Sequence, residues 1–220
     1  MTLALLHTSA AHVPVFDALR DADHPGLTLR HLVRAHLLDR ARAHGPDAAA
    51  DGVRAALADA MAAGADAVLC TCSTIGGVAE SHAADAGVPV LRVDRPMAAA
   101  AVRTGRRVTV VATVASTLEP TTALLKEEAA RHTRTVDVTT VLVDGAWERF
   151  EAGDQEGYLR RVTDAVDRVE GADAIVLAQG STAPAAARAT TAVPVLASPR
   201  TGLRAAADLC QRRRTERGRT

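Results

Sequence analysis

The chain has 220 residues, its 26 Lys and Arg side chains are balanced by 26 Asp and Glu, and only 2% of its residues are aromatic. This length is enough to bury a sizeable core. The balanced charge and the scarcity of rings exclude a surface that tracks phosphates or stacks on bases, so we expect no nucleic acid partner. No apolar run reaches the roughly 20 residues that span a bilayer, and no basic leader precedes Leu3, so we expect no membrane partner and a cytoplasmic location.

Short apolar runs alternate with Ala-rich helical patterns along the chain. The runs are apolar without alternation, which is typical of strands covered on both faces of a parallel sheet. The alternation therefore predicts an α/β fold in which helices wrap two small parallel sheets. The predicted strands lie at 3–7, 27–33, 66–70, 88–92, 107–112, 136–142, 173–177 and 193–196. The predicted helices lie at 12–21, 47–62, 76–86, 96–104, 117–131, 154–169, 183–190 and 201–213.

The segment 64–91 recurs in altered form at 171–196: both copies open with Gly-Ala-Asp-Ala and close with Val-Pro-Val-Leu. Six residues after the Asp of each copy, Cys72 stands opposite Gln179. The repeat predicts two similar doubly wound units, residues 1–95 plus 200–220 and residues 96–199. We expect a pseudo-two-fold axis to relate them, with the site in the cleft between them.

Small polar residues gather where the predicted strands end. In parallel sheets, ligands bind outside the carboxyl ends of the strands. Hydroxyls that lead into helix N-termini suit a small anion, and without a glycine-rich phosphate cradle a carboxylate fits better than a nucleotide. The same hydroxyls also serve as N-caps whatever the function, so alone they carry little weight. The candidate substrate-binding residues are Thr8, Ser9, Ser73, Thr74, Thr113, Thr117, Gln179, Gly180 and Ser181.

Cys72 is the candidate reactive residue, because a thiol beside a helix N-terminus is where a reactive thiolate is expected. Cys70 falls within the apolar run, so we expect it in the core. Three cysteines form a poor disulfide framework, and Cys70 and Cys72 lack the second close pair of ligands that a zinc site needs, so we expect no metal. The only lysine, Lys126, lies among charged neighbours on a predicted helix, which argues against pyridoxal phosphate. We expect no cofactor.

The segment Asp66-Ala-Val-Leu-Cys-Thr-Cys-Ser-Thr74 resembles the Asp-x-x-x-x-x-Cys-Asn-Thr segment of the aspartate/glutamate racemase superfamily. That superfamily also includes hydantoin racemases, maleate isomerases and arylmalonate decarboxylases. The resemblance continues through Val88-Pro-Val-Leu, Val110-Val-Ala-Thr113 and Asp173-Ala-Ile-Val-Leu-Ala, and covers nearly the whole chain. It implies a cofactor-independent isomerase that transfers a proton at a carbon next to the carboxylate of a small acid.

In the two-cysteine members of the superfamily, one thiolate removes a proton from one face and the second thiol delivers one to the other. Cys72 matches the first cysteine, whereas Gln179 replaces the second and cannot exchange a proton near neutral pH. Three hypotheses stay open: a racemase or isomerase with Cys72 as base or nucleophile, a single-cysteine decarboxylase, and a non-catalytic protein that binds small carboxylates. In the first, Gln179 orients the substrate, and its carboxylate is held by Ser73, Thr74, Thr117 and Ser181.

His7 is the second candidate catalytic residue, since it stands where the glutamate racemases carry an acidic residue. A strand-end imidazole within reach of Cys72 would hold the thiolate as an ion pair or shuttle its proton. The alternative is a buried histidine bonded to the backbone. The sequence leaves open whether the protein forms a homo-oligomer.

Overall fold

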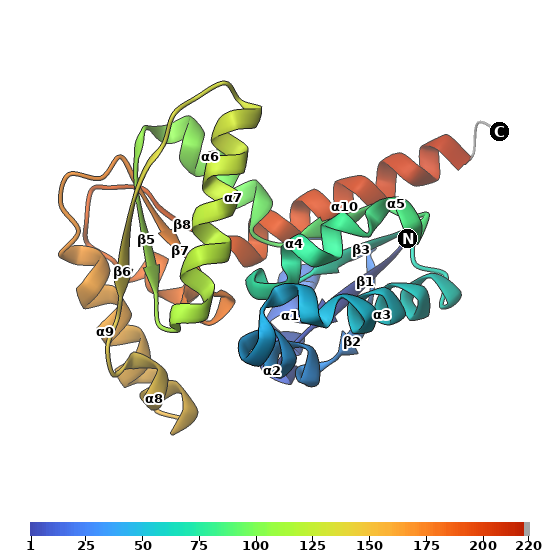
Figure 1. Cartoon of the computed structure of the whole chain (residues 1–220), viewed down its shortest axis with the longest axis horizontal. Helices are drawn as coiled ribbons and strands as arrows, with labels where there is room; N and C mark the ends of the chain where they lie inside the picture. The colour runs from blue at the N-terminus through green and yellow to red at the C-terminus, as the bar shows by residue number, and fades with distance from the viewer. Residues whose placement is uncertain (218–220) are drawn as a thin grey trace. The chain divides into compact units, whose positions relative to one another are not determined.

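The structure is a computed structural model that describes residues 1–217, and its contacts divide it into two compact units (Figure 1). Unit 1 comprises Met1–Val93 and the chain from Pro199 onward, and unit 2 comprises Asp94–Ser198. Each unit contains a four-stranded parallel sheet with helices on both faces. This confirms the predicted α/β class with two doubly wound sheets. Within residues 1–217, no helix is both long and apolar enough to cross a membrane.

Unit 1 has the strand order β2-β1-β3-β4. One face of the sheet packs against α2 to α5, and the other packs against α1 and α10. In chain order its elements are β1 (Thr2–His7), η1 (Ala10–His12), α1 (Val13–Asp23), β2 (Thr28–Val33), α2 (Ala35–His44), η2 (Pro46–Ala49), α3 (Ala50–Ala62), β3 (Ala67–Cys70), α4 (Ser73–Ser81), α5 (Ala83–Ala86), β4 (Val90–Arg92) and α10 (Ser198–Arg217).

Unit 2 repeats this order as β6-β5-β7-β8. One face of its sheet packs against α6 and α7, and the other packs against α8, α9 and η4. Its elements are α6 (Arg95–Thr104), β5 (Arg107–Ala112), η3 (Ala115–Thr117), α7 (Leu118–Arg131), β6 (Asp137–Leu142), α8 (Ala146–Glu151), α9 (Gln155–Asp167), β7 (Ala174–Leu177), η4 (Gly180–Ala187) and β8 (Val195–Ala197).

The repeated Gly-Ala-Asp motif has the same structural role in both units. Asp66 Oδ2 accepts a hydrogen bond of 2.9 Å from the N–H of the first residue of β1, and Asp173 Oδ2 accepts one of 2.8 Å from the first residue of β5. Gly64 and Gly171 begin the two motifs with positive φ angles of 76° and 69°, which favour glycine. The motif therefore holds the amino end of β1 and of β5, at the opposite edge of each sheet from the strand ends where ligands bind in parallel sheets.

Most predicted elements are present, and the differences have local causes. Helices α2 and α8 were not predicted: α2 buries only Leu37 and Ala41, too few for a clear apolar stripe, and α8 is a short six-residue helix. The helix predicted at 183–190 is the 3-10 helix η4, which contains Pro184. Proline has no backbone N–H and disfavours an α-helical interior.

Candidate functional site

Cys72 lies at the carboxyl edge of the unit 1 sheet, at the N-terminus of α4. The ends of β1 and β3 are neighbours there, because Leu6 pairs with Cys70 in the parallel register. Cys72 is the N-cap of α4, with φ −111°, ψ 118° and no side-chain capping bond. Ser73 and Thr74 form the first turn, so the candidate residues of this loop lie together at the positive end of the helix dipole.

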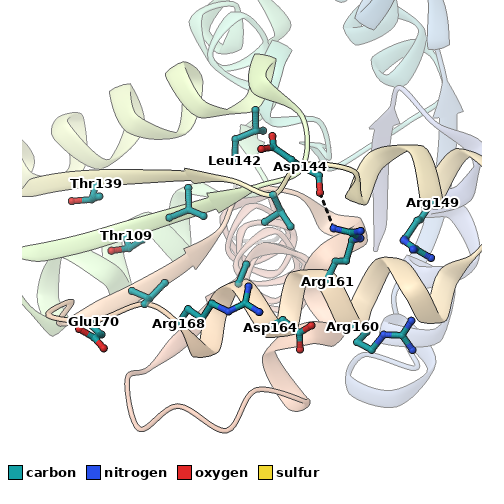
Figure 2. Close-up of a pocket in the computed structure, with 14 residues that line it drawn as sticks. Thr109, Thr139, Leu142, Asp144, Arg149, Arg160, Arg161, Asp164, Arg168 and Glu170 are labelled. Atoms are coloured by element: carbon teal, nitrogen blue, oxygen red, sulfur yellow. Dashed lines mark hydrogen bonds between the residues drawn. The ribbon is translucent and has the colours of Figure 1, made fainter.

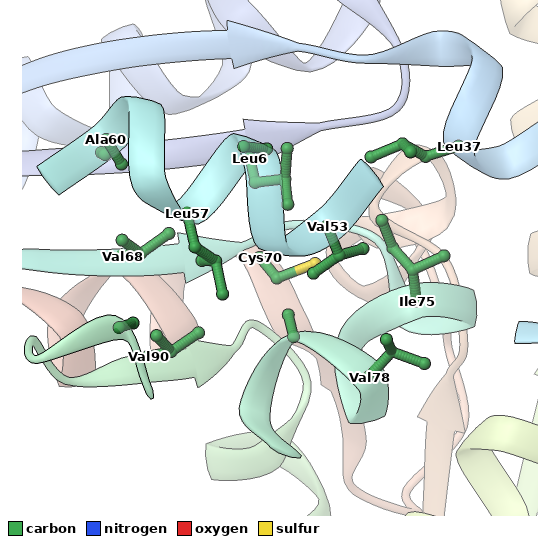
Figure 3. Close-up of a cluster of buried hydrophobic side chains, with 14 of the residues drawn as sticks. Leu6, Leu37, Val53, Leu57, Ala60, Val68, Cys70, Ile75, Val78 and Val90 are labelled. Atoms are coloured by element: carbon green, nitrogen blue, oxygen red, sulfur yellow. The ribbon is translucent and has the colours of Figure 1, made fainter. Parts of the chain in front are cut away.

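The two neighbouring cysteines differ in burial. The Cys72 side chain is 8% exposed, whereas Cys70 is fully buried in the hydrophobic cluster of Figure 3. The Cys70 thiol donates a hydrogen bond of 3.6 Å to the carbonyl oxygen of Cys72. The expectation that Cys70 is a core residue is confirmed, and its thiol supports the loop that carries Cys72.

His7, the last residue of β1, is fully buried, and both of its ring nitrogens have side-chain partners. Nδ1 lies 2.8 Å from Thr71 Oγ1, and Nε2 lies 2.8 Å from His31 Nδ1. The Thr71 hydroxyl donates to the Leu6 carbonyl at 3.1 Å, so it accepts from His7 Nδ1–H. On the far side of His31, Nε2 lies 3.3 Å from Asp17 Oδ1.

These contacts favour the structural alternative for His7, and its catalytic role stays a prediction. No ring nitrogen is left to face Cys72 in this arrangement. Burial, with the neighbouring His31 and His12 rings, lowers the pKa of His7 to about 3, so the imidazole is neutral near pH 7 and cannot hold a thiolate as an ion pair. His7 is thus a buried histidine whose hydrogen-bond partners are side chains.

Thr8 and Ser9 follow His7 on the loop beyond β1. Thr8 is 6% exposed, and the Ser9 hydroxyl caps η1 by accepting a 3.3 Å hydrogen bond from the Ala11 N–H. His12 follows at the end of η1, and its Nδ1 has no hydrogen-bond partner within residues 1–217. The loop therefore offers hydroxyls and one unsatisfied imidazole nitrogen beside His7.

Arg92, at the end of β4, is a buried charge at the same sheet edge that the sequence analysis missed. Its neighbour in register is Cys70, and its Nη2 donates to the carbonyl oxygen of Ser73 at 3.3 Å. A Cβ added at Gly76 would lie 2.9 Å from the Arg92 Cβ, so α4 packs closely on this side chain. The feature of the sequence that could have identified Arg92 is its position as a charged residue at the end of an apolar run.

In unit 2, Gln179 occupies the position that corresponds to Cys72. Each is the second residue beyond the third strand of its sheet, and each is an extended N-cap, since Gln179 has φ −130° and ψ 144°. Gln179 Oε1 accepts 2.6 Å and 3.1 Å hydrogen bonds from the N–H and hydroxyl of Thr113, the residue after β5. Gly180 and Ser181 begin η4 beside it.

Tyr158 of α9 completes this hydrogen-bond network and was not among the predicted residues. Its hydroxyl lies 2.7 Å from Ser181 Oγ and 3.3 Å from Thr113 Oγ1. The side chain is fully buried, and burial raises the pKa of its phenol. No short sequence pattern connects α9 to the strand ends, so only the fold could identify it.

The loop after β5 also carries two further candidate hydroxyls. Thr117 is the N-cap of α7, but its hydroxyl donates to the Val114 carbonyl at 2.8 Å and makes no capping bond. Within residues 1–217, the buried Ser116 Oγ has no hydrogen-bond partner. The N–H groups of Thr117 and Leu118 already donate to Val114 and Ala115, so the Ser116 hydroxyl is the polar group of this loop for which the structure shows no partner.

A cavity of about 760 Å³ in unit 2 does not coincide with these residues (Figure 2). It lies along β6 and α9, with Thr139 on one side and Arg160, Arg161 and Arg168 on the other. None of the predicted site residues lines it. Within residues 1–217, no three His, Cys, Asp or Glu side chains group as metal ligands.

Comparisons with known proteins agree with this architecture. The sequence model of the family Asp/Glu/Hydantoin racemase matches residues 6–206. No curated protein matches the sequence. Among solved structures, the chain is similar to an aspartate racemase homologue from Pyrococcus horikoshii OT3, with a TM-score of 0.70, 13% identity, and 96% of this chain and 99% of that one covered.

Two further solved structures are similar at comparable coverage. The allantoin racemase from Klebsiella pneumoniae has a TM-score of 0.65 and 20% identity, with 96% of this chain and 88% of that one covered. An arylmalonate decarboxylase has a TM-score of 0.61 and 17% identity, with 96% and 92% covered. At these identities the likeness shows a shared fold.

Proposed function

Because the chain belongs to the Asp/Glu/hydantoin racemase family, we propose that it is a cofactor-independent enzyme of the racemase or isomerase type that acts on a small carboxylic acid through Cys72. The observation that carries the proposal is the position of Cys72, a residue 8% exposed at the N-cap of α4 with no side-chain capping bond of its own. The dipole of α4 favours a negative charge at this place.

The proposed chemistry is proton transfer at the carbon next to the carboxylate. The Cys72 thiolate takes the proton, the electron pair of the C–H bond moves into the carboxylate to form an enediolate, and a proton then returns to carbon. In the isomerase form, the thiolate instead adds to a double bond next to the carboxylate and leaves after rotation.

Gln179 supports a single-cysteine decarboxylase as the second candidate, because an amide cannot supply the second proton that two-base racemisation needs. In that reaction the bond to a departing carboxylate breaks, its electron pair forms the enediolate, and the Cys72 thiol protonates the carbon after carbon dioxide leaves. One thiol is enough for this sequence. The similar structure named arylmalonate decarboxylase has the same fold.

Deuterium exchange tests the proposal. Amino acids, hydantoins and substituted malonates are incubated with the protein in heavy water, and NMR follows the hydrogen next to the carboxylate while released carbon dioxide is measured. We expect exchange or decarboxylation of at least one compound, and its loss in Cys72→Ser because a serine hydroxyl is too weak an acid to ionise there. Cys210→Ala, in α10, is the matched control and keeps the activity. Turnover that survives in Cys72→Ser contradicts the proposal, and binding without turnover in the wild type supports the non-catalytic hypothesis.

A further inference from the structure

We propose that the cavity along β6 and α9 of unit 2 is a binding site for an elongated organic acid with a carboxylate at each end (Figure 2). One carboxylate binds at Arg168, and the other binds at Arg160 and Arg161. Every residue that lines the cavity belongs to unit 2. The site is therefore separate from the reaction proposed for Cys72, and neither proposal depends on the other.

The sheet contributes a pair of threonines to the cavity. Thr109 of β5 and Thr139 of β6 are partners in the parallel register and both line the cavity, so their side chains lie next to each other on the face toward α9. Thr109 is 6% exposed, and within residues 1–217 its hydroxyl has no hydrogen-bond partner. A buried hydroxyl that is left without a partner costs free energy, so we expect Thr109 to bind a group from outside the protein.

The repeat between the units indicates that the fold does not require this hydroxyl. Thr109 is the third residue of β5, and the third residue of β1 is Ala4, which is fully buried. Ala4 belongs to the apolar cluster that includes residues of α3, and α3 precedes β3 as α9 precedes β7. Unit 1 thus fills the equivalent position with an apolar side chain, which supports a binding role for Thr109 in unit 2.

Helix α9 contributes arginines at two levels of the cavity. Arg160 and Arg161 lie in the middle of α9, and Arg168 follows its last residue, about 10 Å farther along the helix axis. Arg161 Nη1 donates to the Asp144 carbonyl oxygen at 3.3 Å. Within residues 1–217, the guanidinium groups of Arg160 and Arg168 form no hydrogen bond or ion pair. Because a guanidinium group matches a carboxylate with two parallel hydrogen bonds, each level can bind one acid group.

Acidic side chains also line the cavity and restrict the kind of ligand. Asp164 lies on α9 between the two levels of arginines, and Asp144 and Glu170 line the cavity as well. These carboxylates repel an anion whose charge is spread along its length, such as a nucleic acid, but they do not repel an uncharged chain. Val141 and Ala165 give the cavity an apolar surface. The ligand that fits is therefore a chain of methylene groups with a carboxylate at each end.

Suberate, an eight-carbon dicarboxylate whose extended chain spans about the distance between the two levels, is the probe. NMR titration of the whole protein gives the dissociation constant and identifies the amides whose signals shift. We expect shifts in β6 and α9. We also expect binding about 10-fold weaker for octanoate, which has one carboxylate, and for succinate, which is too short to reach both levels. Octanediamide has the length of suberate without its charge and is expected to cause no shift.

Two variants test the residues of the site. We expect Arg168→Gln, which alters an exposed side chain, to weaken suberate binding about 10-fold and to remove most of its advantage over octanoate. Thr109→Val keeps the shape of the side chain, removes the hydroxyl and is expected to weaken binding about 3-fold. The matched controls are Arg103→Gln, at an exposed arginine of α6, and Thr140→Val, at an exposed threonine of β6 that does not line the cavity. Both leave the affinity unchanged.

Three results would overturn the inference. Suberate that shifts no amide of β6 or α9 shows that the cavity does not bind it. An affinity that is the same in the wild type, Arg168→Gln and Thr109→Val places the bound suberate elsewhere. Octanoate that binds as tightly as suberate shows that only one acid group is recognised. Since none of these results involves Cys72, each of them leaves the proposed function intact.

Discussion

His7 belongs to a chain of four hydrogen-bonded side chains that joins β1, β2, α1 and the loop after β3 in unit 1. Thr71 follows β3, His7 ends β1, His31 lies on β2 and Asp17 lies on α1. Because Thr71 accepts from His7 Nδ1–H, the other nitrogen of His7 accepts from His31 Nδ1–H. The other ring nitrogen of His31, Nε2, lies 3.3 Å from Asp17 Oδ1 and joins the chain to α1.

The low pKa of His7 makes the stability of the protein depend on pH. Its value of about 3 in the folded chain lies below the ordinary 6.5, so the unfolded chain binds this proton first as the pH falls. The stabilisation is complete above about pH 6.5 and is lost progressively between pH 6.5 and 3, by on the order of a few kcal/mol. Urea unfolding at pH 7 and pH 5 measures it. We expect a smaller pH dependence in His7→Asn and the wild-type dependence in His44→Asn, which alters an exposed histidine. An unchanged dependence in His7→Asn would assign the effect to another group.

Some residues of the candidate site can be identified from the sequence, whereas their hydrogen-bond partners cannot. Cys72 and Gln179 are found from the sequence because the repeat aligns them and because each follows a recognisable strand. The partners of His7 and Thr113 are not found, since His31 and Tyr158 reach them through strand pairing and helix packing. The direction of a hydrogen bond, and with it the neutral form of His7, is decided only by those partners.

At the scale of elements, α10 is the helix that completes unit 1. It covers the face of the sheet formed by Leu3, Leu5 and Leu69, together with α1. Gly202 allows this close packing, because a Cβ there would overlap the backbone carbonyl of Val93. The glycine is therefore required by helix contact, since no positive φ is involved.

Substitution of Gly202 measures the importance of that contact. We expect Gly202→Ala to lower the free energy of unfolding by about 1–3 kcal/mol, because backbone atoms cannot move aside as a flexible side chain can. Thermal unfolding followed by circular dichroism gives the value. Gly26→Ala is the control, since an added Cβ there meets nothing within 4 Å, and we expect a change near zero. Equal stability of Gly202→Ala and the wild type would show that α10 adjusts its position freely.

Strands were easier to predict than helices in this chain. The buried strands β1, β3, β5 and β7 are continuous apolar runs, and their positions match the sequence pattern to within one or two residues. The helices are rich in alanine, which occurs on both buried and exposed faces. Their apolar periodicity is therefore weak, and the sequence predicts their ends poorly. The helix predicted at 76–86 is two helices in the structure, α4 and α5, and begins earlier, at Ser73.

At the scale of the whole molecule, the chain leaves unit 1 after Val93 and returns at Pro199. Unit 2 is one continuous segment with apolar clusters on both faces of its sheet. We expect the fragment 94–198 to fold alone and unfold cooperatively in urea, because every strand and helix that forms its core lies within it. The fragment 1–93 lacks α10 and is expected to remain unfolded or aggregate. An unfolded 94–198 fragment would mean that its core depends on the rest of the chain.

The late position of α10 in the chain has a consequence for synthesis on the ribosome. Leu203, Ala206 and Cys210 pack on β1 and β3, which are translated first. While residues 94–198 are translated and can fold, one apolar face of the unit 1 sheet therefore stays incompletely covered. A nascent chain therefore keeps this apolar face incompletely covered until α10 has been translated, and a premature stop before α10 leaves it so.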